Sequence, residues 1–285
     1  MRGLVLALAL LLGGCGTLLS IPGDRCTGIP AQPDTLPGAT SFTYRTASGR
    51  DLRIHVFQPA GPRAARPAIL FFFGGGWRVG RITAFRPQAE AFAARGYVTL
   101  LADYRVTCRD GTSPLAATND AAAAYAWLRD HAAALGINSR RIALSGGSAG
   151  GHLALVTAMK APAAERPAAL ILFNPAVDLV TPARWYQKPF ARGISPSLLP
   201  LAALPPTMIF HGEDDATVPI ASVRTFCARA TAAGRSCTVI GYRGKGHGFY
   251  HDYSLDPQIG TTPYADTLAR SERFADPLLN PALPR

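Results

Sequence analysis

Short, strongly apolar segments alternate with amphipathic segments along most of the chain. Residues 67–73 (PAILFFF) and 168–176 (AALILFNPA) are almost continuously apolar, which is typical of strands buried on both faces of a parallel sheet. Residues 117–137 instead carry apolar side chains at helical spacing. The alternation predicts an α/β fold.

The same reading gives the other elements of that fold. We expect two strands in 41–59 around a turn at Ser48–Gly49, a helix over 84–96, a strand over 97–105, a strand, sharp turn and helix in 141–160, strands at 207–212 and 237–244, and helices over 219–233 and 262–275. Repeated βα units predict a central, mostly parallel β-sheet with helices on both faces. Residues 178–204 interrupt the pattern with four prolines and predict a short cap-like insertion.

The N-terminus has the pattern of an export signal. Arg2 precedes an apolar stretch over residues 4–12, and small residues lead to Cys15. The sequence LGGC resembles the lipobox of bacterial lipoproteins, which implies cleavage before Cys15 and lipid on that residue. The chain would then be an exported lipoprotein, anchored to the membrane on the periplasmic or cell-surface side. An uncleaved anchor over residues 4–21 is the alternative.

These features divide the chain into three parts. Residues 1–14 form the signal peptide, and residues 15–40 form a tether or extended lead-in that is rich in Pro and Gly from residue 20 on. Residues 41–280 form one catalytic domain, which is an ordinary size for an α/β domain.

The balance of charge is strongly basic. The net charge is +11, and 26 arginines and three lysines carry the positive charge. Such a balance attracts anionic surfaces and polymers, and it raises the hypothesis of an acidic glycan as substrate. A GC-rich genome would give the same abundance of Arg, Ala, Gly and Pro. No basic stripe is interleaved with aromatic residues, so nucleic acid is not an expected partner.

Four cysteines follow Cys15: Cys26, Cys108, Cys227 and Cys237. An even number in an exported protein suggests two disulfides. Cys227 lies on a predicted helix and Cys237 at the next strand, where the two elements can bring them together. Cys26 and Cys108 then pair by elimination, although free thiols stay open as an alternative. There is no C-x-x-C spacing and no His/Cys cluster, so no metal is expected.

The segment SGGSAGGH contains the pattern G-x-S-x-G at a strand-to-helix turn. Small neighbours two residues before and after Ser148 are what a serine on such a strained turn requires. The turn lifts the hydroxyl above the sheet and points the N-terminus of the following helix at developing negative charge. Ser148 is therefore the candidate nucleophile, and Ser145 is the competing hydroxyl.

A serine nucleophile needs a histidine base and a carboxylate that orients the histidine. His247 lies in GKGHGF after a late strand, between two glycines, and His251 and His211 are the alternatives. The acid comes from HGEDDATVP, where the spacing favours Asp215 over Asp214.

Several motifs together resemble the α/β-hydrolase fold. FFFGGGW, ADYRV, SGGSAGGHLA, FNPAVD, IFHGEDDATVP and GKGHGF resemble the bacterial esterase/lipase branch related to the hormone-sensitive-lipase and acetyl-esterase families, over about residues 42–275. By that resemblance the backbone N–H groups of Gly75, Gly76 and Ala149 form the oxyanion hole. Phe73 occupies the position of a histidine in the family, which is expected to alter the geometry of the loop rather than abolish activity.

The predicted function is that of a serine carboxylesterase acting on small, acetyl-like acyl esters, including those on carbohydrates. No cofactor is required. Trp77 is expected to line the substrate pocket, with simple packing as the alternative, and Asp103 and Arg105 are expected to form a structural ion pair. Two other functions stay open: a serine peptidase of the prolyl-oligopeptidase kind, and a non-catalytic binding protein on a hydrolase fold.

Overall fold

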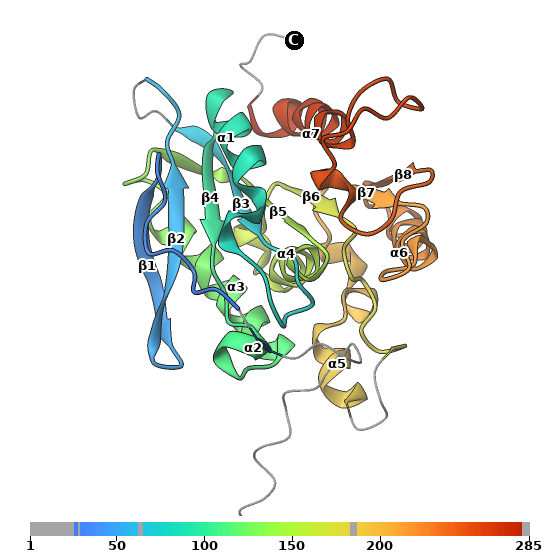
Figure 1. Cartoon of the computed structure of the whole chain (residues 1–285), viewed down its shortest axis with the longest axis horizontal. Coiled ribbons are helices and arrows are strands. Elements are labelled where there is room, and N and C mark those ends of the chain that lie inside the picture. The colour runs from blue at the N-terminus through green and yellow to red at the C-terminus, as the bar shows by residue number, and fades with distance from the viewer. Residues whose placement is uncertain (1–25, 28, 62–64, 183–186, 281–285) are drawn as a thin grey trace, which may run out of the picture.

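The apolar runs of the sequence form the centre of an eight-stranded sheet (Figure 1). The structure, a computed structural model, describes residues 26–27, 29–61, 65–182 and 187–280. The strand order is β1-β2-β4-β3-β5-β6-β7-β8, in which β1 and β2 pair antiparallel, β2 and β4 pair antiparallel, and all other pairs are parallel. The strands are β1 (Thr40–Ala47), β2 (Arg50–Phe57), β3 (Arg66–Phe72), β4 (Val98–Ala102), β5 (Ile137–Gly147), β6 (Ala169–Phe173), β7 (Thr207–Gly212) and β8 (Cys237–Tyr242).

Side chains in the middle of the sheet are buried on both faces. Leu70 of β3 lies opposite Leu100 of β4 on one side and Leu144 of β5 on the other, and all three are fully buried. Leu144 in turn pairs with Leu170 of β6. Burial on both faces explains why these strands are apolar at consecutive positions rather than at alternate ones.

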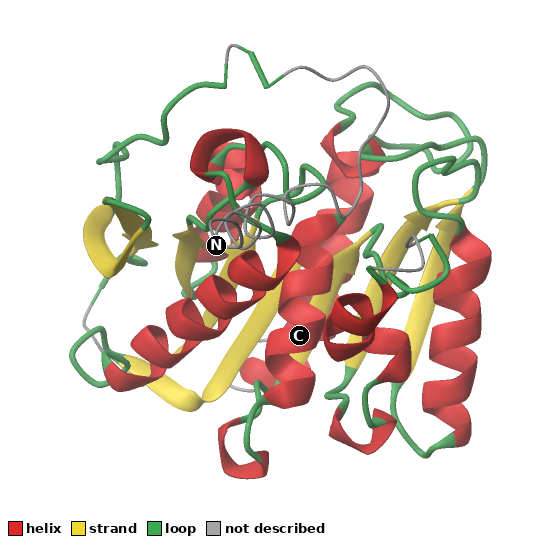
Figure 2. Ribbon diagram, turned by 90° about the horizontal axis from the view of Figure 1, so that it is seen from below, coloured by secondary structure: helices red, strands yellow, loops and turns green. Residues whose placement is uncertain are grey.

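Helices cover both faces of the sheet (Figure 2). They are α1 (Arg86–Ala94), α3 (Pro114–Asp130), α4 (Ala149–Lys160), α6 (Ile220–Ala232) and α7 (Pro263–Leu279). The β3-α1-β4 connection runs one way along the sheet and those of α3, α4 and α6 run the other way, so right-handed crossovers place α1 on the opposite face from these three. Arg95 at the end of α1 pairs with Asp276 of α7, so α7 lies beside α1 (Figure 1).

The structure adds short elements that the sequence pattern does not indicate. These are α2 (Thr107–Asp110), α5 (Lys188–Ile194) in the insertion, and the 3₁₀ helices η1 (Ile82–Phe85), η2 (Ala163–Glu165), η3 (Pro196–Leu198), η4 (Leu201–Ala203) and η5 (Phe249–His251). The expected helix over 117–137 has different bounds. It begins at Pro114, a residue suited to the first helical turn, and ends at Asp130, because Ile137 already belongs to β5. The last helix extends to Leu279 rather than 275.

Two disulfides join the pairs expected from the sequence. Cys26 is bonded to Cys108, with 5.0 Å between their Cα atoms, and this bond ties the lead-in to α2. Cys227 of α6 is bonded to Cys237 at the start of β8, with 5.2 Å between their Cα atoms.

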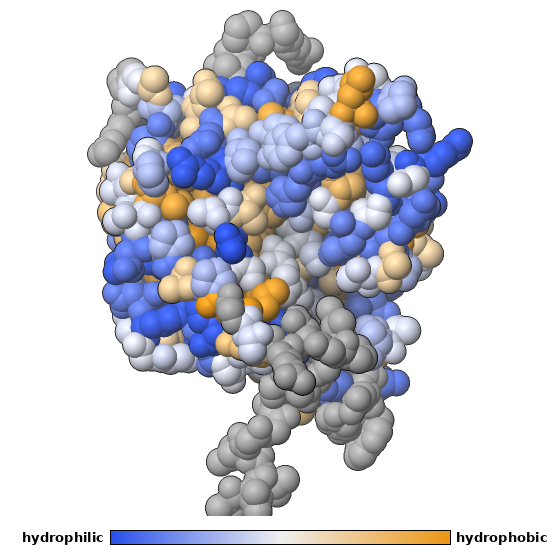
Figure 3. All heavy atoms as spheres, in the orientation of Figure 1, coloured by the Kyte–Doolittle hydropathy of each residue, from blue (hydrophilic) through white to orange (hydrophobic). Residues whose placement is uncertain are grey.

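The expected signal peptide and Cys15 lie outside the described residues. Within the described part of the chain, none of the helices combines the length and the apolar character needed to cross a bilayer. The face drawn in Figure 3 is mainly hydrophilic and carries small, separate hydrophobic areas.

Candidate active site

Ser148 occupies a sharp turn between β5 and α4. Its φ is +53°, a conformation that a residue with a side chain adopts only under strain. The turn packs α4 against the end of β3. A Cβ added at Gly150 would lie 2.1 Å from the carbonyl oxygen of Phe72, and one at Gly146 would lie 2.7 Å from the same oxygen. This close packing explains why glycine stands two residues before and two residues after the serine.

Backbone hydrogen bonds fix the turn between β5 and the end of β6. The N–H of Ser148 donates to the carbonyl of Phe173 (2.8 Å). The carbonyl of Ser148 accepts from the N–H groups of His152 (3.0 Å) and Ala176 (3.4 Å). Ser148 is half-buried, so part of the residue is accessible to solvent.

Asp215 lies in the turn after β7 and is almost fully buried. Its Oδ1 accepts hydrogen bonds from the N–H groups of Thr217 (2.8 Å) and Val218 (2.9 Å). Its Oδ2 accepts from Asn174 Nδ2 (2.6 Å) and from His247 Nδ1 (2.7 Å). Both oxygens are therefore fully engaged, and the carboxylate holds a fixed orientation.

The same contacts keep Asp215 ionised. Burial alone would raise its pKa, but the hydrogen bonds from the Val218 N–H and from His247 outweigh burial, so the pKa of Asp215 lies below its usual value. Its neighbours behave differently. Asp214 is exposed, and Glu213 pairs with Arg224 (2.6 Å). Among the described residues Asp215 alone of these three acids contacts His247.

His247 lies in the loop that follows β8. Because an ionised carboxylate only accepts hydrogen bonds, the Nδ1 atom that faces Asp215 carries a proton. In the neutral form of the ring, Nε2 then has a free lone pair. This is the tautomer that a general base requires. No hydrogen bond between His247 and Ser148, both of them described residues, is present in this unliganded structure. Such contacts often tighten only when substrate binds.

Tyr250 and Asn174 connect the histidine and acid loops to the nucleophile turn. The sequence patterns assign neither of them a role. A Cβ added at Gly147 would lie 2.0 Å from the hydroxyl oxygen of Tyr250, so Tyr250, three residues after His247, packs on the backbone next to Ser148. Asn174 follows β6, has a φ of +43°, and donates to Asp215. A positive φ in a non-glycine residue marks such a constrained site only once the structure is known.

The alternative histidines have other surroundings. His211 is fully buried behind Asp215, and its Nε2 lies 2.8 Å from the carbonyl of Val218 and 3.4 Å from Asp215 Oδ2. Burial lowers the pKa of His211, and its Nε2 contacts the same Oδ2 of Asp215 that accepts from His247. His251 packs its ring against those of Phe85 and Tyr250.

The glycine loop after β3 lies beside the nucleophile turn. A Cβ added at Gly74 would lie 3.4 Å from the Cβ of Ser148. Gly75 has a φ of +127°, and a Cβ there would lie 2.2 Å from the carbonyl oxygen of Val79, so only glycine fits this turn. No described acceptor takes the N–H groups of Gly75, Gly76 or Ala149. Of these three residues, Ala149 directly follows Ser148, and the two glycines directly follow Gly74.

Phe73, at the family's histidine position, supports the loop by stacking. Its ring lies 4.0 Å from that of Tyr104, centroid to centroid, and the two planes differ by 12°. The Tyr104 hydroxyl donates to the carbonyl of Phe73 (2.7 Å). A Cβ at Gly80 would lie 2.3 Å from the Phe73 ring, so the loop folds closely over this side chain.

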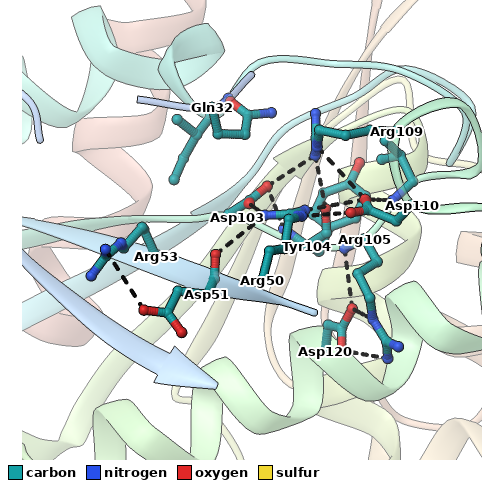
Figure 4. A network of polar contacts seen from close by, with 12 residues as sticks. Gln32, Arg50, Asp51, Arg53, Asp103, Tyr104, Arg105, Arg109, Asp110 and Asp120 are labelled. Atoms are coloured by element: carbon teal, nitrogen blue, oxygen red, sulfur yellow. Dashed lines mark hydrogen bonds and ion pairs between the residues drawn. The ribbon is translucent and has the colours of Figure 1, made fainter. Parts of the chain in front are cut away.

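A network of ion pairs holds Tyr104 in place (Figure 4). Asp103 is fully buried and pairs with Arg50 and with Arg109, whose guanidinium also donates to the carbonyl of Tyr104 (3.2 Å). The expected ion pair between Asp103 and Arg105 is wrong, because Arg105 turns to Asp120 instead (2.8 Å). Both residues nevertheless have structural partners.

The far end of the glycine loop is held by the lead-in. Gln32 Nε2 donates to the carbonyl of Gly80 (3.0 Å), and its Oε1 accepts from the N–H of Ile82 (2.9 Å). From the other side, the N–H groups of Thr107 and Cys108 donate to the carbonyls of Trp77 and Arg78, both at 2.9 Å. A Pro/Gly-rich composition gave no signal for these contacts, which pair residues far apart in sequence.

Trp77 is buried, with only 3% of its surface exposed, and lies edge-on to His152 at 4.9 Å between ring centroids. His152 Nε2 donates to the carbonyl of Ile194 in the insertion (2.7 Å), and burial lowers the pKa of His152 to about 4. The indole N–H of Trp77 and Nδ1 of His152 have no partner among the described residues. Trp77 therefore packs from the glycine loop against the first turn of α4.

A metal centre finds no support in the described part of the chain, where no group of three or more His, Cys, Asp or Glu side chains could hold an ion.

Comparison with known proteins shows that the chain is similar to esterases. The family model BD-FAE matches residues 54–176, a segment that contains the glycine loop and Ser148. A solved structure of esterase Est2 from Thermogutta terrifontis with bound propionate has a TM-score of 0.78 and 35% sequence identity, and the match covers 87% of this chain and 97% of that one. The same esterase has also been solved with butyrate and after phosphorylation by paraoxon.

Curated relatives match over shorter segments. Lipase 2 from Moraxella sp. is 36% identical over 124 residues, which are 41% of this chain and 28% of that protein. The acetylxylan esterase of Xylanibacter ruminicola is 27% identical over 241 residues, which are 76% of this chain and 49% of that protein. The chain therefore spans less than half of the length of these relatives.

Proposed function

This chain belongs to the esterases of the α/β-hydrolase fold, and from that membership we propose that it hydrolyses small acyl esters through a Ser148–His247–Asp215 triad. The observation that carries the proposal is the 2.7 Å contact between His247 Nδ1 and the buried, ionised Asp215, at the edge of the sheet where Ser148 occupies its strained turn. This contact selects the histidine tautomer that can accept a proton from the serine.

In the first half of the reaction Ser148 Oγ attacks the ester carbonyl carbon. The hydroxyl proton moves to His247 Nε2, and the imidazolium that forms is stabilised by Asp215. The electron pair of the C=O bond moves to oxygen. When the tetrahedral intermediate collapses, the C=O bond re-forms, the bond to the alcohol breaks, and the alcohol leaves with the proton from Nε2.

The negative oxygen of that intermediate is stabilised by backbone donors. The N–H groups of Gly75, Gly76 and Ala149 supply them, and their lack of other described acceptors supports this role. The N-terminus of α4 adds a favourable dipole. Water then repeats the attack on the acyl-enzyme with His247 as base, and the carboxylic acid leaves as Ser148 regains its proton.

The acyl group is proposed to be short. Propionate and butyrate are the acyl ligands bound in the solved structures of the Thermogutta esterase. The name of the Xylanibacter relative supports acetyl esters on carbohydrates as one class of substrate. The matches to esterases support ester bonds as the substrate of this chain, rather than the peptide bonds that a prolyl-oligopeptidase-like enzyme would cleave.

We further propose that the protein is exported and anchored through lipid on Cys15. Two disulfides support an oxidising compartment. Growth with labelled fatty acid tests the anchor: the label should enter the wild-type chain and not Cys15→Ala. A labelled Cys15→Ala chain would overturn it.

The experiment that tests the esterase follows hydrolysis of p-nitrophenyl esters from acetate to decanoate by the full chain. We expect the highest kcat/KM for acetate to butyrate and a fall to background in Ser148→Ala. Ser145→Ala is the matched control, because Ser145 is buried three residues earlier and its hydroxyl has no described partner. Activity that survives Ser148→Ala would overturn the triad, and a preference for decanoate would overturn the short acyl group.

A further inference from the structure

A groove of about 510 Å³ lies between the insertion after β6 and helix α6. This volume falls within the range of small-molecule sites, about 300–1,000 Å³. Its walls include Asp178, Thr181, Arg192, Leu198, Thr225 and Arg229. None of these residues has a part in the triad or the oxyanion hole.

Both walls of the groove start at active-site loops. On one side, the N–H of Ala176 donates to the carbonyl of Ser148, and Asp178 follows two residues later, at most about 7 Å along the chain. On the other side, the Asp215 turn leads directly into α6, which begins at Ile220. The groove therefore begins near the loops that carry Ser148 and Asp215.

The charge of the groove is positive and unbalanced. Neither Arg192 nor Arg229 pairs with a carboxylate of the described residues, and Arg229 uses only one N–H, toward the carbonyl of Ser197 (2.9 Å). Most arginines around Asp103 and Asp120, by contrast, are neutralised in ion pairs. A guanidinium has five N–H donors, so both groups retain donors for an anion.

The acid in the lining, Asp178, offsets only one of these two positive charges. Asp178 Oδ1 accepts from the N–H groups of Val180 (2.8 Å) and Thr181 (3.2 Å), and Oδ2 accepts from the Thr181 hydroxyl. Its carboxylate is committed to its own turn. A ligand in the groove would therefore meet two guanidinium groups and one carboxylate whose oxygens are already hydrogen-bonded.

The rest of the lining suits a sugar ring. Leu198 is half exposed and offers an apolar surface for the C–H face of a ring, and Thr225 offers a hydroxyl. Carboxylate and guanidinium match each other as bidentate partners. A saccharide with a carboxylate uses both properties of the groove.

We propose that the groove binds the alcohol part of the substrate, and that this part is a carboxylate-bearing saccharide held by Arg192 and Arg229. The proposal rests on the proposed esterase function. In it, the acyl group lies between Ser148 and the glycine loop, and the sugar acid extends past the half-buried Ala176 into the groove. The net charge of +11 would add long-range attraction for such substrates.

A matched pair of substrates tests the proposal: mono-O-acetyl methyl glucuronide and mono-O-acetyl methyl glucoside, which differ by one carboxylate. We expect the full chain to prefer the glucuronide by about tenfold in kcat/KM at low salt, mainly through KM, and to lose most of the preference in 0.5 M salt. Arg192→Ala/Arg229→Ala should lower the ratio to about one. Arg192→Lys/Arg229→Lys should keep part of it, because lysine retains charge without the bidentate geometry.

The control removes two charges elsewhere. Arg140→Ala/Arg273→Ala takes exposed arginines from the other end of β5 and from α7, and it should keep the preference. Equal rates of the wild-type chain on both sugars would overturn the proposal, as would an equal loss in the control, which would assign the effect to net charge. Failure of the proposed function looks different, because p-nitrophenyl acetate would then show no turnover that depends on Ser148.

Discussion

The acid and histidine loops follow two neighbouring parallel strands, β7 and β8, whereas the glycine loop after β3 is held by segments from elsewhere in the chain. On the first side, His211 lies opposite Gly241 in the sheet register, and the N–H of Asp214 donates to the carbonyl of Lys245 (3.0 Å). On the second side, the contacts reach 48 residues back to Gln32 and 31 residues forward to Tyr104.

This difference shows which part of the site is determined by strand pairing in the sheet. Strand pairing brings Asp215 and His247 to one edge, and a few turn hydrogen bonds then complete the pair. The glycine loop is held instead by the lead-in, by α2 and by the Cys26–Cys108 bond between them. Substitutions on the two sides should therefore impair activity in different ways.

The largest effect is expected on the acid side. Asp215→Asn should lower kcat by about 10⁴, because the amide favours the wrong tautomer of His247 while leaving the turn folded. The measurement is kcat on p-nitrophenyl acetate, together with the thermal midpoint. Asp214→Asn is the matched control, since Asp214 is exposed in the same turn, and a similar loss in the control would reject the assignment of the acid.

A smaller loss is expected in the glycine loop. Gly75→Ala forces a Cβ to within 2.2 Å of the Val79 carbonyl, so the loop must shift and its donors move away from the oxyanion. Loss of such donors costs about 10²–10³ in kcat. Gly76→Ala is the comparison, because its φ of +62° has open space around it and alanine can adopt it at modest cost. Equal losses in both variants would mean that the clash at Gly75 is not what fixes the loop.

The residues of the site also differ in how well the sequence predicts them. G-x-S-x-G, the acid turn and the late histidine are local patterns, so Ser148, Asp215 and His247 could be picked from the sequence with their roles. Asn174, His211 and Tyr250 support them through contacts that exist only when strands from different parts of the chain meet. No local pattern carries that information.

The glycine loop shows the limit more clearly. Its glycines could be assigned to an oxyanion hole by resemblance, but Phe73 could not be explained until its ring was found on Tyr104. The Pro/Gly-rich composition of the lead-in predicts a tether or an extended segment and no particular contact. The contacts of Gln32 depend on where the lead-in crosses the domain, which composition does not encode.

Lowering the pH should reduce the stabilising contributions of His152, which packs against Trp77 of the glycine loop, and of Asp215 in different ranges of pH. Burial lowers the pKa of His152 from 6.5 to about 4, so between these values the unfolded chain binds a proton that the folded chain does not, and stability falls as the pH falls. The full loss is about 3 kcal/mol. The pKa of Asp215 is lowered too, so its contribution is present above about pH 3.8 and is lost only below it.

Urea unfolding between pH 7 and pH 4.5 measures this difference. His152→Gln should flatten the pH dependence of the unfolding free energy by about 1.4 kcal/mol per pH unit. His55→Gln gives a reference, because burial also lowers the pKa of His55 to about 4 on β2, away from the site. An unchanged slope in His152→Gln would show that protonation of His152 is not coupled to unfolding.

The smallest effect concerns Gln32, which we treat as a positioning residue for the glycine loop. Gln32→Leu removes a donor to the Gly80 carbonyl and an acceptor from the Ile82 N–H. Losing the two contacts should loosen the loop and lower kcat about fivefold, equivalent to about 1 kcal/mol, with little change in KM. Steady-state kinetics on p-nitrophenyl butyrate measure both parameters.

Stability must be separated from position in that measurement, and Gln58→Leu makes the separation. Gln58 Nε2 donates to the carbonyl of Leu135 (3.2 Å). This bond lies at the end of the sheet opposite the site loops, because the preceding Phe57 pairs with Thr99 at the start of β4. Both variants should lower the thermal midpoint slightly, because each leaves a polar backbone group without its partner. Only Gln32→Leu should lower kcat, since only Gln32 reaches the loop that holds the oxyanion donors. A fall in kcat in both variants would mean that the lead-in stabilises the domain without positioning the loop.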